Sequence, residues 1–165
     1  MKTSFADVAM VESNLKYSAA VSRKKAIYGR KDDIRSDFYR DYTRILHSTA
    51  YRRLKHKTQV FFATHNDHVC TRIEHVNHVA SISYIISKAL NLNFELANAI
   101  ATGHDVGHTP FGHQGESVIN KIVQNDKIDT FWHERNSIFF ERFQIIAMID
   151  IFTVKSLHSI QQLII

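Results

Sequence analysis

The feature that most constrains this chain is the stretch at residues 103–116, which reads GHDVGHTPFGHQGE. Three histidines and two carboxylates fall within these fourteen residues. His104 and Asp105 are adjacent, and an imidazole beside a carboxylate suits a divalent metal ion with mixed nitrogen and oxygen ligands. The apolar run at residues 94–102 has helical spacing, so we expect a buried helix that ends at this pair. A surface or hydrogen-bonded His–Asp pair is the alternative interpretation.

The second half of the stretch is expected to turn and to begin another helix. His108 follows His104 by four positions and shares its face if the first helix continues that far. Gly107 and Pro110 interrupt that helix, since the residue before a proline is pushed out of the α region. Pro110 can occupy the first position of the next helix, where its missing N–H costs nothing.

His113 and Glu116 then lie three positions apart on this next helix, predicted at residues 114–124, and can share a face. An imidazole held by a carboxylate is suited to moving protons near neutral pH. A simple hydrogen-bonded pair at the helix N-terminus is the alternative. Their spacing therefore predicts that His113 and Glu116 face each other on this helix.

Another histidine-bearing helix is predicted upstream, at residues 71–90, from its broad apolar face. His75 lies four residues before Val79 and points to the core side, where a histidine bonded to a backbone carbonyl is the alternative to a metal ligand. Arg72 precedes His75 by three positions, so a phosphate could contact both its guanidinium and a metal at His75. The alternative for Arg72 is an ion pair with a surface carboxylate such as Asp67.

The remaining segments are predicted to be mostly helical. Ser36 is the expected N-cap of a helix with Asp37 in its first turn. The basic residues along and beyond this helix, Arg53 among them, offer planar forks of donors to phosphate, and a solvated charged face is the alternative. We also expect an extended segment at residues 58–63, a short helix at 8–15 and helical structure from 131 onwards.

Composition sets broad limits on the kind of protein. The 165 residues suit one domain, with a basic arm at residues 1–34 before it, and the net charge of +5 favours polyanionic partners. The single cysteine, Cys70, cannot form an internal disulfide, which suggests a reducing compartment. We expect no signal peptide, because Asp7 and Glu12 interrupt the early apolar residues, and no membrane span. These features together predict a cytoplasmic protein.

Several motifs together resemble the deoxyguanosine triphosphate triphosphohydrolase family of the HD-domain phosphohydrolases. They are RSDFYRD at residues 35–41, RILHS at 44–48, YRRLKHKTQVF at 51–61, TRIEH at 71–75 and the stretch at 103–116. The resemblance implies an all-α, HD-domain helical bundle over residues 35–165. It also implies hydrolysis of a deoxynucleoside triphosphate to a deoxynucleoside and inorganic triphosphate.

The same resemblance implies roles for individual residues. The ligands of a divalent metal ion of the Mn, Mg or Fe type would be His75, His104 and Asp105. The catalytic pair would be His113 and Glu116. The residues that contact substrate would be Arg72, His108 and Arg53.

The chain also departs from the family pattern. Thr43 stands where the family usually has an aspartate, and residues 133–137 (HERNS) only loosely resemble a later family element. The family's fourth metal ligand is a downstream aspartate, so we expect an HD domain incomplete at its C-terminus. Two alternatives therefore stay open: an HD phosphoesterase for another nucleotide, and a non-catalytic fragment that binds nucleotide or single-stranded nucleic acid. A homo-oligomer also stays open.

Overall fold

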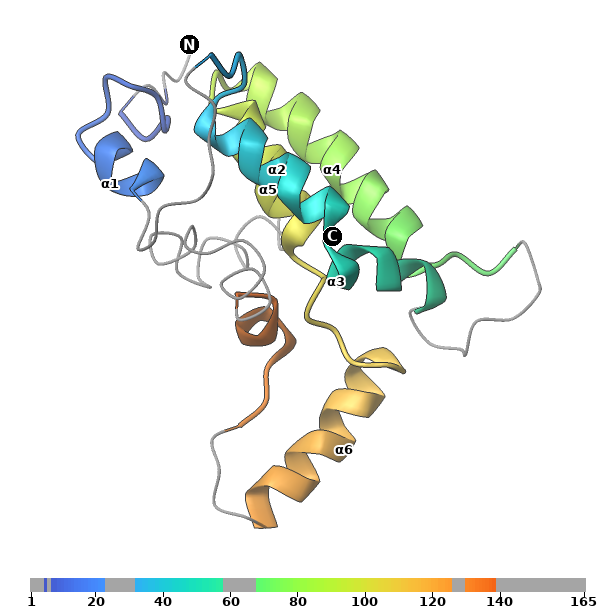
Figure 1. Cartoon of the computed structure of the whole chain (residues 1–165). Helices are drawn as coiled ribbons and strands as arrows, with labels where there is room; N and C mark the ends of the chain where they lie inside the picture. Colours follow the sequence, from blue (N-terminus) through green and yellow to red (C-terminus); the bar gives the residue numbers. More distant parts are fainter. Residues whose placement is uncertain (1–4, 6, 23–31, 58–67, 126–129, 139–165) are drawn as a thin grey trace.

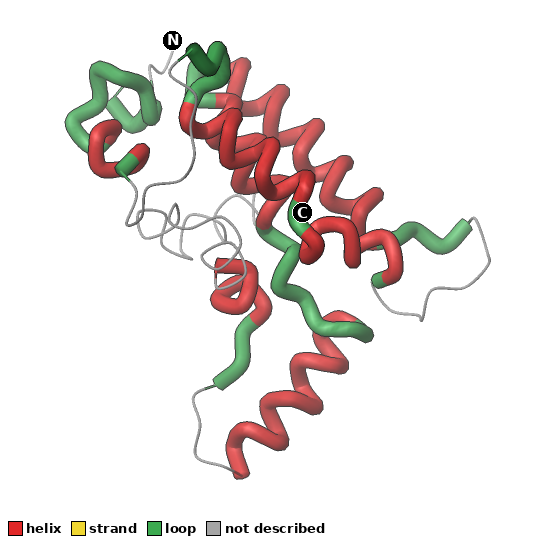
Figure 2. Tube along the Cα trace, viewed as in Figure 1, coloured by secondary structure: helices red, strands yellow, loops and turns green. Residues whose placement is uncertain are grey.

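The computed structural model of the chain describes residues 5, 7–22, 32–57, 68–125 and 130–138. Within these ranges the fold is all-α, as predicted, with helices joined by turns and loops and with no β-strand (Figure 2). The helices are α1 (Tyr17–Val21), α2 (Asp37–His47), α3 (Thr49–Arg53), the 3-10 turn η1 (Leu54–His56), α4 (Arg72–Ala89), α5 (Phe94–Gly103) and α6 (Gly112–Asn125). Residues 133–138 form a further helical segment.

Side-chain caps fix where the three central helices begin. Ser36 accepts a hydrogen bond from a backbone N–H in the first turn of α2, and Asn93 does the same for α5. Thr71 and Glu74 form a reciprocal capping box at the start of α4. Each cap satisfies an N–H group that the first helical turn leaves unpaired. The helix starts predicted near residues 36, 71 and 94 are therefore confirmed.

The main core lies where α2, α4 and α5 pack side by side, with α3 at one end (Figure 1). Its buried members are Ile45, Ala50, Tyr51, Leu54, Val76, Ala99 and Val106. Burying a large aliphatic side chain such as Leu54 contributes about 1.5–3 kcal/mol. Because Val106 belongs to this core, the turn that follows α5 is anchored against the helices.

A second cluster attaches the described part of the N-terminal region to the same helices. Its buried members are Met10, Ala20, Phe38 and Leu96. The short helix predicted at residues 8–15 is wrong: this stretch forms turns, and α1 begins later. The Asn14 side chain explains the difference, because it donates to the carbonyls of Asp7 and Ala9 and accepts from the Lys16 N–H, which competes with helix formation. The boundary at residue 35 stays a prediction.

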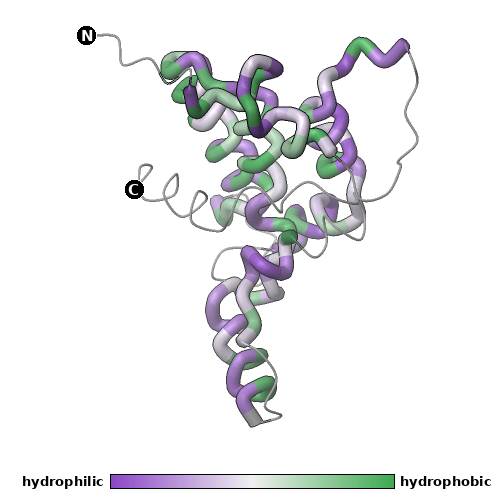
Figure 3. Tube along the Cα trace, turned by 90° about the vertical axis from the view of Figure 1, so that its left-hand side faces the viewer, coloured by the Kyte–Doolittle hydropathy of each residue, from purple (hydrophilic) through white to green (hydrophobic). Residues whose placement is uncertain are grey.

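Helix α6 extends away from the other helices, and hydrophobic and hydrophilic positions alternate along it (Figure 3). The prediction that Pro110 occupies the first position of this helix is wrong, because α6 begins at Gly112. Phe111 and Gly112 have positive φ angles of 67° and 56°, so the backbone is not in the right-handed helical conformation between Pro110 and the body of α6. The segment at 58–63 and the helix predicted beyond residue 138 lie outside the described residues. No described helix has the length and apolar character needed to cross a membrane.

Candidate metal centre

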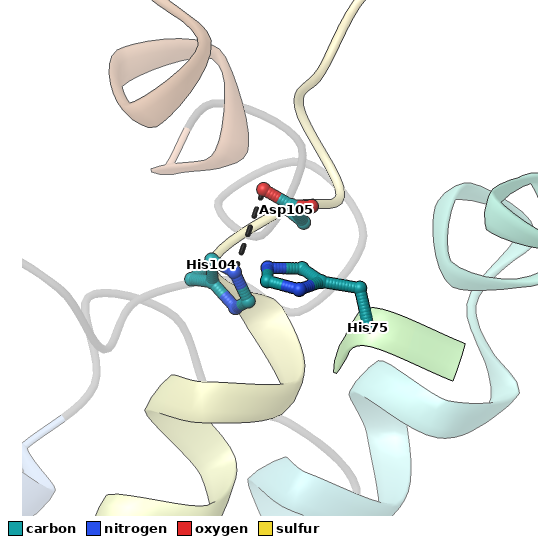
Figure 4. A group of neighbouring side chains, drawn as sticks. All are labelled: His75, His104 and Asp105. Carbon is teal, nitrogen blue, oxygen red and sulfur yellow. Dashed lines mark ion pairs between the residues drawn. The ribbon is translucent and has the colours of Figure 1, made fainter. Parts of the chain in front are cut away.

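Two helices bring the predicted metal ligands together (Figure 4). His75 comes from the first turns of α4, His104 ends α5 as its C-cap, and Asp105 follows in the next turn. One candidate ligand atom from each residue lies within 4.8 Å of the others. His104 Nε2 and Asp105 Oδ1 are 3.5 Å apart, and the rings of His75 and His104 meet edge to face. The structure therefore brings together the three residues that the sequence predicted to share a metal.

The hydrogen bonds and burial of the two histidines suit binding of a metal ion. His104 Nδ1 lies 2.7 Å from the carbonyl oxygen of Ala101, so this nitrogen carries the proton and donates it. In the neutral form of His104 with this proton, the Nε2 lone pair is the free donor, on the side of Asp105. Burial lowers the pKa of His75, which favours the neutral, ligating form of its imidazole. Two imidazoles and one carboxylate form a donor set for a divalent ion.

Arg72 lies inside the site and not on the surface. Its Nη1 donates to Asp105 Oδ2 at 2.8 Å, and both side chains are 5% exposed. Burial by itself would raise the pKa of Asp105, but the facing imidazoles and Arg72 outweigh burial and lower it. Asp67, the surface partner suggested as the alternative, lies outside the described residues. A phosphate contact of Arg72 stays a prediction. Arg72 Nε is buried with no hydrogen-bond partner among the described residues.

Other cations surround the same turn. Lys57 Nζ donates to the carbonyl oxygen of His108 at 2.5 Å. Burial lowers the pKa of Lys57, and the positive charges of Arg72 and Arg53 lower it further. Arg53 itself is exposed, at the end of α3. Arg72 therefore lies beside Asp105, whereas Arg53 is linked to this region only through its charge on Lys57, and the substrate contacts of both arginines stay predictions.

His108 lies at the site, although not on a continuation of the helix that carries His104, as was predicted. It does not continue the face of His104, because α5 ends at Gly103 and residues 104–107 form a turn. The turn instead places His108 Nε2 3.4 Å from Asp105 Oδ1. Burial is the main reason that the pKa of His108 is lowered to about 3, so its imidazole is neutral near pH 7.

Beside His108 lies a second polar group, built around Glu116. His113 Nδ1 is 3.3 Å and His133 Nδ1 is 3.1 Å from the same oxygen, Glu116 Oε2. The ring of His133 stacks on that of His108, with centroids 3.8 Å apart. The pairing of His113 with Glu116 agrees with the spacing, although their catalytic role stays a prediction. The sequence analysis gave His133 no role in the site. The loose match of residues 133–137 (HERNS) to a later family element was the signal from which it could have been found.

The turn that carries the candidate ligands is held by the segment that contains His133. Ser137 Oγ accepts from the Gly107 N–H at 2.9 Å and lies 2.9 Å from the His104 carbonyl oxygen. Asn136 Nδ2 donates to the Gly107 carbonyl oxygen at 2.7 Å. A Cβ atom at Gly107 would lie 2.1 Å from the Ser137 nitrogen. Glycine is therefore required for this close backbone approach.

Comparison with known proteins agrees with this arrangement. Residues 72–146 match the HD domain family, and the matched range contains all three candidate metal ligands.

Several curated proteins are similar to the chain beyond this domain. Each is named deoxyguanosinetriphosphate triphosphohydrolase-like protein. The one from Caldanaerobacter subterraneus subsp. tengcongensis is 52% identical over 117 residues, which cover 71% of this chain and 33% of that protein. The one from Desulfatibacillum aliphaticivorans is 50% identical over 105 residues, which cover 64% of this chain and 29% of that protein. The one from Brucella ovis is 49% identical over 106 residues, which cover 64% of this chain and 26% of that protein. The chain thus spans a third or less of the length of these relatives.

Proposed function

We propose that the chain is part of a metal-dependent hydrolase that converts a deoxynucleoside triphosphate, such as dGTP, to a deoxynucleoside and inorganic triphosphate. The observation that carries the proposal is the convergence of His75, His104 and Asp105 from two helices. The HD-domain match supports a metal-dependent phosphohydrolase, and the names of the relatives support the choice of substrate. In the part of the chain that the structure describes, three residues make up this ligand group.

The hydrogen bonds around the site indicate which atoms of His104 and Asp105 would bind the metal. His104 would bind through Nε2, since its Nδ1 is engaged by Ala101, and Asp105 would bind through Oδ1, since its other oxygen accepts from Arg72. His75 would complete the set from α4. The chemistry that a divalent ion supplies at such a site is Lewis acidity and a water of lowered pKa.

The basic residues beside the ligands suit a triphosphate. Arg72 keeps an unpaired Nε after bonding to Asp105, Lys57 binds the turn at the His108 carbonyl, and the charge of Arg53 acts on Lys57. Donors fixed in a partly buried site stabilise phosphate oxygens more strongly than the same donors would in water. His108 would bind as a neutral donor or acceptor, since its pKa is far below neutrality.

His113 would transfer the proton during cleavage. Its Nδ1 faces Glu116, so the carboxylate fixes the tautomer and leaves Nε2 for the proton exchange. The His113 side chain is 78% exposed, which allows a substrate to approach it. General acid–base assistance of this kind is typically worth about 10²–10⁴-fold in rate.

An assay of dGTP cleavage with Mn²⁺ or Mg²⁺ tests the proposal. We expect deoxyguanosine and inorganic triphosphate as products, and we expect their loss in a variant that combines His104→Gln with Asp105→Asn. His47→Gln is the matched control, because His47 is an exposed histidine at the end of α2. Release of dGDP or orthophosphate would point to another phosphoesterase. Protein that retains metal but releases nothing would point to a binding module.

A further inference from the structure

The group around Glu116 has the features of a metal site in its own right. His113 and Glu116 lie in the first two turns of α6, and His133 begins the helical segment 133–138. One candidate ligand atom from each of the three lies within 4.8 Å of the others. This group shares no residue with His75, His104 and Asp105.

The distances in this group match those between ligands of a small divalent ion. In a tetrahedral zinc site with bonds of about 2.0–2.1 Å, neighbouring ligand atoms lie about 3.3 Å apart. The two Nδ1–Oε2 separations, 3.3 Å from His113 and 3.1 Å from His133, agree with that spacing. Without an ion the same contacts serve as hydrogen bonds, because the His133 separation lies within the usual N–H···O range of about 2.7–3.2 Å and the His113 separation just beyond it.

A second carboxylate sets the orientation of the His133 ring. His133 Nε2 lies 3.3 Å from Glu134 Oε1, on the opposite side of the ring from Glu116. Metal-ligating histidines commonly donate their other N–H to such a carboxylate. With the proton on Nδ1, His133 donates to Glu116. With the proton on Nε2, facing Glu134, the Nδ1 lone pair faces the Glu116 oxygen, and a cation between these two atoms can bind both.

Backbone contacts fix these positions without any ion. Glu116 Oε1 accepts from the backbone N–H of His133 at 3.0 Å, so this carboxylate also caps the segment. Asn120 bonds both the N–H and the carbonyl of Phe131, at 2.7 and 3.0 Å. The exposed His113 leaves one side of the group open to solvent, where a water can complete four-coordination.

We propose that His113, Glu116 and His133 form a second metal site for a borderline transition-metal ion, Zn²⁺ above all, with Glu134 as its outer carboxylate. Two imidazoles and one carboxylate favour Zn²⁺ over Mg²⁺. Binding at this site does not depend on the proposed hydrolase function. Where that function holds, Zn²⁺ here occupies His113 and Glu116 and inhibits hydrolysis.

Calorimetric titration of the whole chain with Zn²⁺ tests the site, together with Co²⁺ as a spectroscopic substitute. We expect His113→Gln and His133→Gln to weaken one binding event at least about tenfold, and Glu134→Gln to weaken it about 10–100-fold. His104→Gln, which changes the other ligand group, retains this event, and His47→Gln behaves like the parent. Co²⁺ bound here gives the intense visible absorption of a four-coordinate ion.

The result for His113→Gln decides the matter, because an exposed side chain can be replaced without loss of the fold. Parent-like stoichiometry and affinity for Zn²⁺ in this variant would overturn the second site. The same holds if the only Zn²⁺ event disappears in His104→Gln, since all binding would then belong to the first group. Both results are read from binding alone, so an inactive hydrolase leaves the test intact.

Discussion

Replacing Gly107 by alanine would push a methyl group into the backbone that holds the metal turn. The new Cβ would lie 2.1 Å from the Ser137 nitrogen, 2.4 Å from the His133 oxygen and 2.6 Å from the Asn136 carbonyl carbon. All three are backbone atoms, so no side-chain rotation relieves the overlap. Overpacking costs about 1–3 kcal/mol, and each of the two lost hydrogen bonds at Gly107 about 1 kcal/mol. We expect the free energy of unfolding to fall by about 3–5 kcal/mol.

The chain contains its own probe for this change. Trp132 is the only tryptophan and lies directly before His133. Urea unfolding of Gly107→Ala, followed by tryptophan emission and by far-ultraviolet circular dichroism, would show altered emission and a lower midpoint. Ser117→Ala on the exposed side of α6 is the control. If Gly107→Ala keeps both the emission and the midpoint of the parent, segment 133–138 does not dock on the turn as described.

Three further predictions follow from the site. Arg72→Ala removes the ion-pair partner of the buried Asp105 carboxylate and should lower the free energy of unfolding by about 3–5 kcal/mol, part of which bound Mn²⁺ restores. Thermal unfolding with and without Mn²⁺ checks this, and an unchanged melting midpoint contradicts it. Combining His104→Ala with Asp105→Ala should remove the Mn²⁺ held by the first ligand group, and elemental analysis of Mn²⁺-loaded protein showing parent-like content would contradict the first metal site. Burial alone would raise the pKa of Glu116, but the hydrogen bonds from His133 outweigh burial, so the pKa lies below its usual value. Stability from this carboxylate is therefore present above pH of about 4.3 and lost as the pH falls through the lowered value, and Glu116→Gln should lack that part of the acid transition.

The helices of the core could be predicted because their signals are local. Ser36 and Thr71 each have the cap chemistry and the apolar spacing of a helix start within a few residues. The short helix expected at 8–15 failed because the apolar spacing took no account of the hydrogen bonds that Asn14 makes to nearby carbonyls. Likewise, the positive φ of Phe111, which keeps Pro110 outside α6, has no local signature in a phenylalanine.

Some residues of the site could also be predicted from local spacing, and others could not. His104 and Asp105 are neighbours in sequence, and His75 lies at the matching end of the preceding helix, so spacing alone indicated that they meet. The partner of Arg72 is 33 residues away, and the pairing of the two depends on how α4 and α5 pack. His133 reaches Glu116 and His108 only through docking of its segment on the glycine turn. Contacts of this kind depend on tertiary structure, which a single sequence read by spacing does not reveal.

The contact between Gly107 and Ser137 also sets an order of events during synthesis. The two residues are 30 positions apart, and translation at about 5–20 residues per second separates their emergence by roughly 2–6 s. During that interval the turn with His104 and Asp105 has emerged, while the N–H and carbonyl of Gly107 still lack their native partners. Water must occupy these backbone groups until Ser137 and Asn136 arrive. The nascent chain therefore presents its first ligand group before the segment that locks it exists.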